Sequence, residues 1–169
     1  MKQQGFTLIE LLVVVIIMGT LTSIALPQYR RAMDRARAGE AMAMLPAIFE
    51  ARERWIIEHG CRWTGSNEYT CSDGSSLGFD KLDIESKGVI NATNSNVLET
   101  NNFTYTLRAG TPTDISQPCV SAVARWGENR HLNSSTIFFR GDKFSCLDNG
   151  YEGCDILNVA DDDHRGGCI

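Results

Sequence analysis

Six cysteines are the residues of this chain most suited to covalent chemistry, and all lie beyond residue 60. None belongs to a Cys-x-x-Cys pair, the spacing typical of zinc sites. An even number in loop-rich surroundings favours disulfides in an oxidising compartment over buried, reduced thiols of a cytosolic domain. The sequence alone does not choose among the possible pairings. The disulfide candidates are Cys61, Cys71, Cys119, Cys146, Cys154 and Cys168.

Signs of a metal site or of catalysis are weak. Asp161, Asp162, Asp163 and His164 stand together and could offer oxygen ligands to calcium, but they lack the spaced Asp-x-Asn pattern of a calcium loop. A solvated acidic turn is the preferred interpretation. The catalytic motifs His-Glu-x-x-His and Gly-x-Ser-x-Gly are absent, as is a phosphate-binding loop. We therefore predict no catalytic residue, no metal and no cofactor.

The net charge of −5 argues against nucleic acid as a partner, because nucleic-acid-binding domains usually carry a basic surface. With 169 residues the chain is about the size of one domain, and 43% apolar residues suffice for a core. One compact domain with an appendage is expected.

Glu10 is the most unusual polar residue, because it interrupts the apolar run "GFTLIELLVVVIIMG" from Gly5 to Gly19. A carboxylate in hydrocarbon or in a protein interior is costly unless another group compensates its charge. Glu10 is thus a candidate functional residue that needs a compensating group.

The pattern divides the chain into four segments: residues 1–5, 6–26, 27–59 and 60–169. The first is a polar, basic leader, and the second holds 21 mostly apolar residues. A helix of that length spans roughly 31 Å, about the thickness of a bilayer's hydrocarbon core. A cleaved signal peptide is the alternative, but no small-x-small cleavage site clearly follows the apolar run.

Residues 27–59 are predicted to continue the helix with an apolar stripe on one face. The stripe consists of Ala41, Leu45, Ile48, Phe49 and Trp55, and the polar side of Arg35, Glu40, Arg52 and Glu53. Proline removes a backbone donor and clashes with the preceding turn, so bends are expected at Pro27 and Pro46.

From residue 60 the chain reads as loops and short strands. Three strand-like runs are expected: 102–109, in which Phe103, Tyr105 and Leu107 alternate, then 119–126 and 135–147. The last is predicted to fold at Arg140-Gly141-Asp142-Lys143, and we interpret this Arg-Gly-Asp as a hairpin turn and not as an adhesion signal. The fold class is α+β: a long, partly transmembrane N-terminal helix packed on a small antiparallel sheet.

The segment from Gly5 to Ala41, about a quarter of the chain, resembles the N-terminus of type IV pilin precursors and of the related type II secretion pseudopilins. The resemblance combines a short basic leader ending in Gly5, the aromatic Phe6, the acid Glu10 at the fifth mature position, and about twenty apolar residues. It implies a pilin-like fold and a structural role, so the chain is not expected to be an enzyme.

The resemblance also implies partners and processing. A prepilin peptidase would cut between Gly5 and Phe6 and N-methylate Phe6, after which the chain would wait in the bacterial inner membrane with its head outside the cytoplasm. An inner-membrane assembly platform would then add it to a filament of its own copies and other pilin-like subunits. Glu10 would meet the N-terminal amine of a neighbouring subunit, and the helix between Gly19 and Pro27 would loosen in the fibre.

Several features depart from general rules or from the family pattern. Arg30, Arg31, Arg35 and Arg37 follow the apolar segment, and the positive-inside rule alone would place that side in the cytoplasm. The leader and the cysteines favour the opposite orientation, which we adopt. Pro46 falls where such proteins usually keep regular helix, and pilins commonly have one disulfide where six cysteines occur here. Two alternatives stay open: a secretion pseudopilin, and a monomeric binding module tethered to the membrane.

Overall fold

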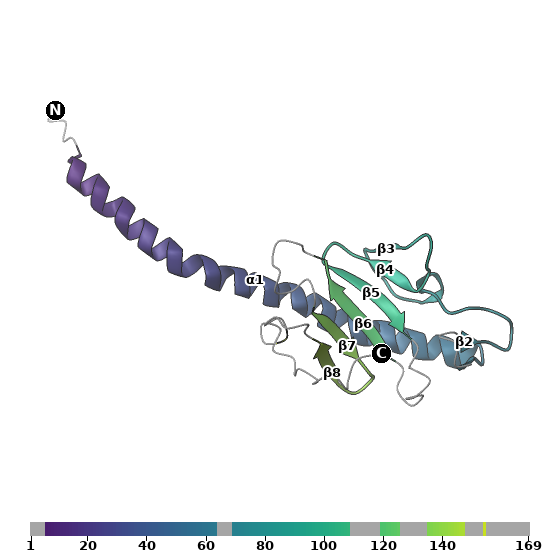
Figure 1. Cartoon of the computed structure of the whole chain (residues 1–169). Helices are drawn as coiled ribbons and strands as arrows, with labels where there is room; N and C mark the ends of the chain where they lie inside the picture. Colours follow the sequence, from purple (N-terminus) through teal and green to yellow (C-terminus); the bar gives the residue numbers. More distant parts are fainter. Residues whose placement is uncertain (1–5, 64–68, 109–118, 126–134, 148–153, 155–169) are drawn as a thin grey trace.

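The computed structural model describes residues 6–63, 69–108, 119–125, 135–147 and 154. A single helix, α1 (Leu8–Glu58), forms the spine of this part of the molecule. Its N-terminal half projects as a free, curved arm, and the sheet lies across its C-terminal half (Figure 1). The predicted α+β class, with one long apolar helix and one antiparallel sheet, is confirmed.

The main sheet is a six-stranded antiparallel meander in the order β3-β4-β5-β6-β7-β8. Its strands are β3 (Val89–Ile90), β4 (Val97–Glu99), β5 (Phe103–Arg108), β6 (Cys119–Ala124), β7 (Thr136–Phe139) and β8 (Phe144–Leu147). A separate hairpin joins β1 (Arg62–Trp63) to β2 (Tyr69–Thr70), and a short 3-10 helix covers Phe79–Lys81. The three predicted strand runs match β5, β6 and the β7–β8 hairpin.

The core lies between the C-terminal half of α1 and one face of the sheet. Buried positions on the helix recur at alternating intervals of four and three residues, which keeps them on one side of an α-helix. The residues with this spacing are Asp34, Ala38, Ala41, Leu45, Ile48, Arg52 and Trp55, and the neighbouring Ala51 is buried beside them. The alternating residues Phe103, Tyr105 and Leu107 of β5 are buried as predicted. The buried residues of α1 and the inward-facing residues of the sheet therefore pack together in one core.

Arg52 was assigned to the polar side of the helix, and this assignment is wrong. Its side chain is fully buried, its Nη1 lies 2.7 Å from Oε1 of Glu53, and its guanidinium lies 5.8 Å from the centre of the Phe49 ring. Position 52 continues the four-three spacing of the buried stripe. Arg52 is therefore buried because of its place on the helix, although its charge alone would favour exposure. A guanidinium can be buried when its charge is paired and its plane stacks on an aromatic ring.

Neither proline breaks the helix, because α1 contains both Pro27 and Pro46. The arm that contains Pro27 curves visibly (Figure 1). Pro46 lies between the fully buried Leu45 and Ile48. Packing of these neighbours against the sheet offsets the one lost backbone hydrogen bond, so the helix continues through Pro46, and a bend there stays a prediction.

The Arg140–Lys143 segment forms the predicted hairpin turn between β7 and β8. The backbone N–H of Arg140 donates to the carbonyl of Lys143 at 3.3 Å, and Gly141 has φ +92°. A Cβ built on Gly141 would lie 2.9 Å from the Phe49 ring on α1. Glycine is therefore required twice here, by its backbone conformation and by the close approach of the helix.

Candidate assembly site on the N-terminal helix

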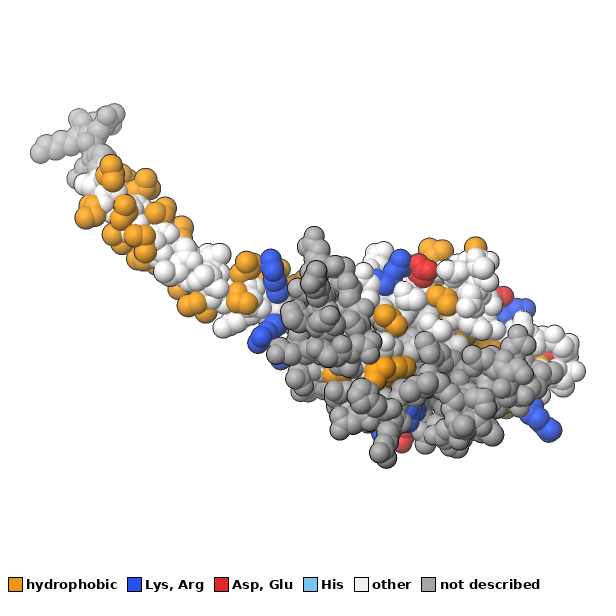
Figure 2. Space-filling model, viewed as in Figure 1, with side chains coloured by type: hydrophobic (Ala, Val, Ile, Leu, Met, Phe, Trp, Pro, Cys, Tyr) orange, Lys and Arg blue, Asp and Glu red, His pale blue; other side chains and the backbone are white. Residues whose placement is uncertain are grey.

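The apolar arm of α1 has no cover within the described part of the chain. Its large hydrophobic side chains from Phe6 to Leu26 are between 43% and 85% exposed. Figure 2 shows them on the stretch of helix outside the head. By length and composition, α1 is the one described helix that could cross a membrane. An apolar surface of this extent requires lipid or other apolar helices around it.

Thr7 and Glu10 close the tip of this arm. Thr7 is the N-cap of α1, and its hydroxyl accepts a hydrogen bond from the Glu10 backbone N–H at 3.4 Å. In return, Oε2 of Glu10 accepts from the Thr7 backbone N–H at 2.9 Å and from the Thr7 hydroxyl at 2.6 Å. This reciprocal arrangement is a capping box, which satisfies N–H groups that have no partner inside the helix.

The capping box supplies a partner for Glu10 that the sequence analysis missed. The signal was present, because Thr-x-x-Glu before an apolar run is the sequence signature of a capping box. A carboxylate also gains from the partial positive charge at a helix N-terminus. In this chain, therefore, Glu10 is compensated by its own helix.

Hydroxyl groups within the arm are also satisfied locally. Thr20 donates to the carbonyl of Ile17 at 2.9 Å, Thr22 to that of Met18 at 2.7 Å, and Ser23 to that of Thr20 at 2.7 Å. Such side-chain bonds to the preceding turn remove polar groups from an apolar surface. They also compete with the backbone ladder and often bend helices.

The stretch between Gly19 and Pro27 therefore combines several features that weaken a helix. A Cβ at Gly19 would meet nothing within 4 Å, so packing within the subunit does not require glycine there. Glycine and proline have the lowest helix propensities, and the three back-bonded hydroxyls lie between them. The stretch is nevertheless helical in the isolated chain, and its loosening in a fibre stays a prediction.

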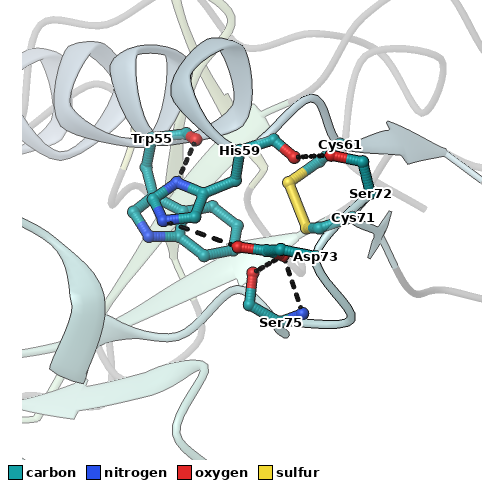
Figure 3. Close-up of polar contacts among 7 residues, drawn as sticks. All are labelled: Trp55, His59, Cys61, Cys71, Ser72, Asp73 and Ser75. Atoms are coloured by element: carbon teal, nitrogen blue, oxygen red, sulfur yellow. Dashed lines mark hydrogen bonds and ion pairs between the residues drawn. A yellow bond between two sulfur atoms is a disulfide. The ribbon is translucent and has the colours of Figure 1, made fainter.

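The opposite end of α1 is fastened to the head by polar contacts and a disulfide (Figure 3). His59 is the C-cap; its ring stacks on that of Trp55 at 4.3 Å between centroids, and its Nδ1 lies 3.0 Å from the Trp55 carbonyl. The Ser72 hydroxyl donates to the His59 carbonyl at 2.8 Å. The Cys61–Cys71 disulfide joins the residues that flank the β1–β2 hairpin. The helix end and the following turn are thereby held together.

Asp73 extends this cluster by an electrostatic contact. Its Oδ2 lies 4.0 Å from Nε2 of His59, and its Oδ1 accepts hydrogen bonds from the hydroxyl of Ser75 at 2.6 Å and from the Ser75 backbone N–H at 2.9 Å. The bonds from Ser75, with a smaller contribution from His59, lower the pKa of the Asp73 carboxyl below its ordinary value. The cluster supports the fold of the head.

Some of the remaining predicted residues lie in the described part of the chain, and others lie outside it. A second disulfide joins Cys146 of β8 to Cys154, so disulfide bonding is confirmed. Cys119 begins β6. Gly5, Cys168 and the Asp161–His164 cluster lie outside the described residues. Within the ranges that the structure describes, no group of three or more His, Cys, Asp and Glu side chains is arranged to hold a metal ion.

Comparison with known proteins supports the resemblance over the N-terminal part. Residues 1–26 match the family model of the prokaryotic N-terminal methylation motif. A fimbrial protein of Neisseria meningitidis is 40% identical over 65 residues, which is 38% of each chain. The type IV major fimbrial protein FimA of Dichelobacter nodosus is 39% identical over 71 residues, covering 38% of this chain and 46% of FimA. A Pseudomonas aeruginosa fimbrial protein is 45% identical over 56 residues, covering 33% of this chain and 36% of its own.

The family model thus covers the arm, and each of these relatives matches 33% to 38% of this chain. The matches span between 36% and 46% of the length of these curated relatives. No solved structure matches the chain. The sequence-based resemblance to type IV pilins is confirmed for this segment.

Proposed function

We propose that this chain is a structural subunit of a type IV pilus-like filament and assembles through the arm of α1. The observation that carries the proposal is a continuous helix with an uncovered apolar half that bears a methylation motif and is rooted in a folded head. The relatives named as type IV major pilins and fimbrial proteins support the same role. A structural role requires no catalytic residue, cofactor or metal.

Processing would convert the arm into an assembly element. A prepilin peptidase cuts between Gly5 and Phe6 and N-methylates the new amine of Phe6. Segment 1–5 is then the leader, 6–26 the transmembrane and assembly helix, 27–59 its amphipathic continuation, and 60–169 the head. Before assembly the chain crosses the bacterial inner membrane once with its head outside the cytoplasm, and an assembly platform transfers it to the fibre.

Glu10 would act as the register determinant of assembly. The hydrogen bonds from Thr7 go to Oε2, so among the described contacts Oε1 keeps its acceptor capacity. The ammonium of Phe6 on an adjoining copy can bind there when that copy has the correct rise. A charge pair formed in a low-dielectric bundle penalises every other register, because an unpaired ammonium would then be buried.

An intact-mass measurement combined with electron microscopy of the native protein tests the proposal. We expect a mature chain that starts at methylated Phe6, together with fibres that disappear when the gene is deleted. A purified native chain that retains residues 1–5 and stays monomeric would refute it, and would favour a tethered binding module. Loss of an exported protein without loss of surface fibres would instead identify a type II secretion pseudopilin.

A further inference from the structure

Four arginines stand where the apolar arm meets the head, and the assembly role does not use them. Arg30, Arg31, Arg35 and Arg37, here called the arginine collar, occupy eight consecutive residues of α1. The one acid among those eight residues is Asp34, which is buried and lies 3.8 Å from Arg37. The collar is therefore a local basic surface on a chain whose net charge is −5.

Arg30 and Arg31, the first two arginines of the collar, lie at the level of a lipid headgroup layer when the arm spans a bilayer, and Arg35 and Arg37 lie about 14 and 17 Å beyond Leu26, on the aqueous side of that layer. Arg30 follows Leu26 by four residues, a rise of about 6 Å along the helix. The headgroup layer on each side of the hydrocarbon core is about 5–8 Å thick. Tyr29, which is 64% exposed, is adjacent, and exposed tyrosines are enriched at the same depth.

The collar faces outward in more than one direction. At 100° per residue, Arg30 and Arg37 lie within about 20° of one another around the helix axis, and Arg31 and Arg35 within about 40°. Figure 2 shows basic side chains on two sides of the helix where it enters the head. Arg30 and Arg31 are exposed, and neither forms an ion pair with another described residue. Lipids packed around the helix can reach both flanks.

We propose that the arginine collar binds anionic phospholipid headgroups and holds the unassembled subunit at a fixed depth in the membrane. Guanidinium groups form paired hydrogen bonds with phosphate oxygens, and their flexible stems let them reach the headgroup layer from a helix. This binding also explains why four arginines follow the span, on the side where the positive-inside rule disfavours them. The inference rests on the membrane-held precursor of the proposed function, but not on polymerisation.

Lipid selection by the full-length chain tests the collar directly. The chain is placed in nanodiscs of phosphatidylcholine with a minority of phosphatidylglycerol, and the lipids retained after mild extraction are counted by native mass spectrometry. We expect enrichment of phosphatidylglycerol, weakened by salt. The double variant Arg30→Gln/Arg31→Gln should reduce the enrichment of phosphatidylglycerol by roughly fivefold per arginine, because that is the factor in affinity that one basic residue near an anionic surface contributes.

Two matched variants separate charge at the collar from charge elsewhere. Arg62→Gln/Lys87→Gln removes the same net charge from exposed positions of the head and should leave the enrichment unchanged. Arg30→Lys/Arg31→Lys should keep most of it. Equal enrichment in wild type and in Arg30→Gln/Arg31→Gln would overturn the inference, as would equal loss in the head variant. If the collar variant selects lipid normally but makes no fibres, the arginines serve contacts between copies and the inference is wrong.

The same measurements keep the two proposals apart. Leader cleavage and fibre yield in cells report on the proposed function, whereas lipid counts in nanodiscs report on the collar alone. Normal lipid selection by a chain that never polymerises would leave the collar standing while the filament role failed.

Discussion

The carboxylate of Glu10 accepts two hydrogen bonds from Thr7, one from its backbone N–H and one from its hydroxyl, at the first turn of α1. The acid in the apolar arm is therefore compensated by its own helix before any second copy arrives. In the proposed assembly, a second copy would bind a group that is already oriented, because the capping box fixes the carboxylate at the helix tip. Helix capping by Glu10 and its proposed role in partner selection can therefore be tested separately.

Replacement of Glu10 by Gln should abolish partner selection while the leader is still cut. Removing one member of a charge pair in a low-dielectric environment costs about 3–5 kcal/mol, so subunit association should weaken by roughly 100-fold or more. Fibre yield by shearing and microscopy measures the effect, and the mass of the processed chain controls for cleavage. Glu50→Gln, on an exposed position of the same helix, serves as the control. Normal fibres from Glu10→Gln would refute the role.

Replacement of Thr7 by Ala should loosen the helix tip without removing the acid. Loss of an N-cap side chain costs about 1 kcal/mol. We expect about fivefold faster hydrogen exchange at the amide of Glu10, measured on the full chain in lipid nanodiscs. Thr7→Ser keeps the hydroxyl and should behave as wild type. Unchanged exchange in Thr7→Ala would show that the capping box contributes nothing to order at the tip.

Truncation of Leu45 should destabilise the head strongly, because its side chain is fully buried between α1 and the sheet. We expect Leu45→Ala to lower the free energy of unfolding by about 2–5 kcal/mol. Ile57→Ala on the same helix removes a side chain that is 78% exposed, and should change it by less than about 0.5 kcal/mol. Denaturant unfolding of the detergent-solubilised chain, followed by tryptophan fluorescence, distinguishes the two. Similar losses in both variants would contradict the described core.

A side chain at Gly141 should destabilise the β7–β8 turn. Alanine would have to adopt φ +92° and would bring its Cβ within 2.9 Å of the Phe49 ring. Strain of this kind costs on the order of 1–3 kcal/mol. Combining Gly141→Ala with Phe49→Leu should recover part of that loss by relieving the close contact. A fully additive double variant would show that the ring plays no part.

The contribution of Asp73 to stability should depend on pH. Hydrogen bonds from Ser75 lower the pKa of Asp73 in the folded chain, so folding favours its charged form. The resulting stabilisation is present above the ordinary aspartate pKa of about 3.9 and is lost as pH falls through the lowered value. Asp73→Asn should therefore reduce the melting temperature at pH 7 and make little difference in strong acid. In a Ser75→Ala background, Asp73→Asn should lower the melting temperature at pH 7 by less. An effect of Asp73→Asn that does not change with pH would contradict stabilisation by the charged carboxylate.

The sequence predicted the elements whose periodicity is long and regular. The apolar arm and the alternation in β5 both follow from side-chain spacing and agree with the structure. The strands β1 to β4 were not predicted, because two or three residues carry no measurable alternation and their pairing depends on distant neighbours. The Cys61–Cys71 and Cys146–Cys154 pairings likewise depend on three-dimensional proximity, which spacing cannot supply.

At the candidate site, some residues could be predicted from the sequence and others could not. Glu10 was predicted to be functional because a charge in an apolar run is costly unless it has a partner, and its role in assembly stays a prediction. The contact with Thr7 was not predicted although Thr-x-x-Glu is the signature of a capping box, because a carboxylate in an apolar run points first to a counter-charge and not to a hydrogen bond within its own helix. Arg52 shows that helical position outweighs residue type when a cation has an acid and a ring within reach.

The arm of α1 carries the proposed contacts between copies, whereas the sheet packs on the other half of the same rod (Figure 1). Tension along a fibre of this design would be carried by the packed arms, and the heads would lie beside the path of the load. The head is thereby relieved of mechanical duty. Substitutions in the head that leave the arm unchanged should therefore not lower the force at which such a fibre breaks.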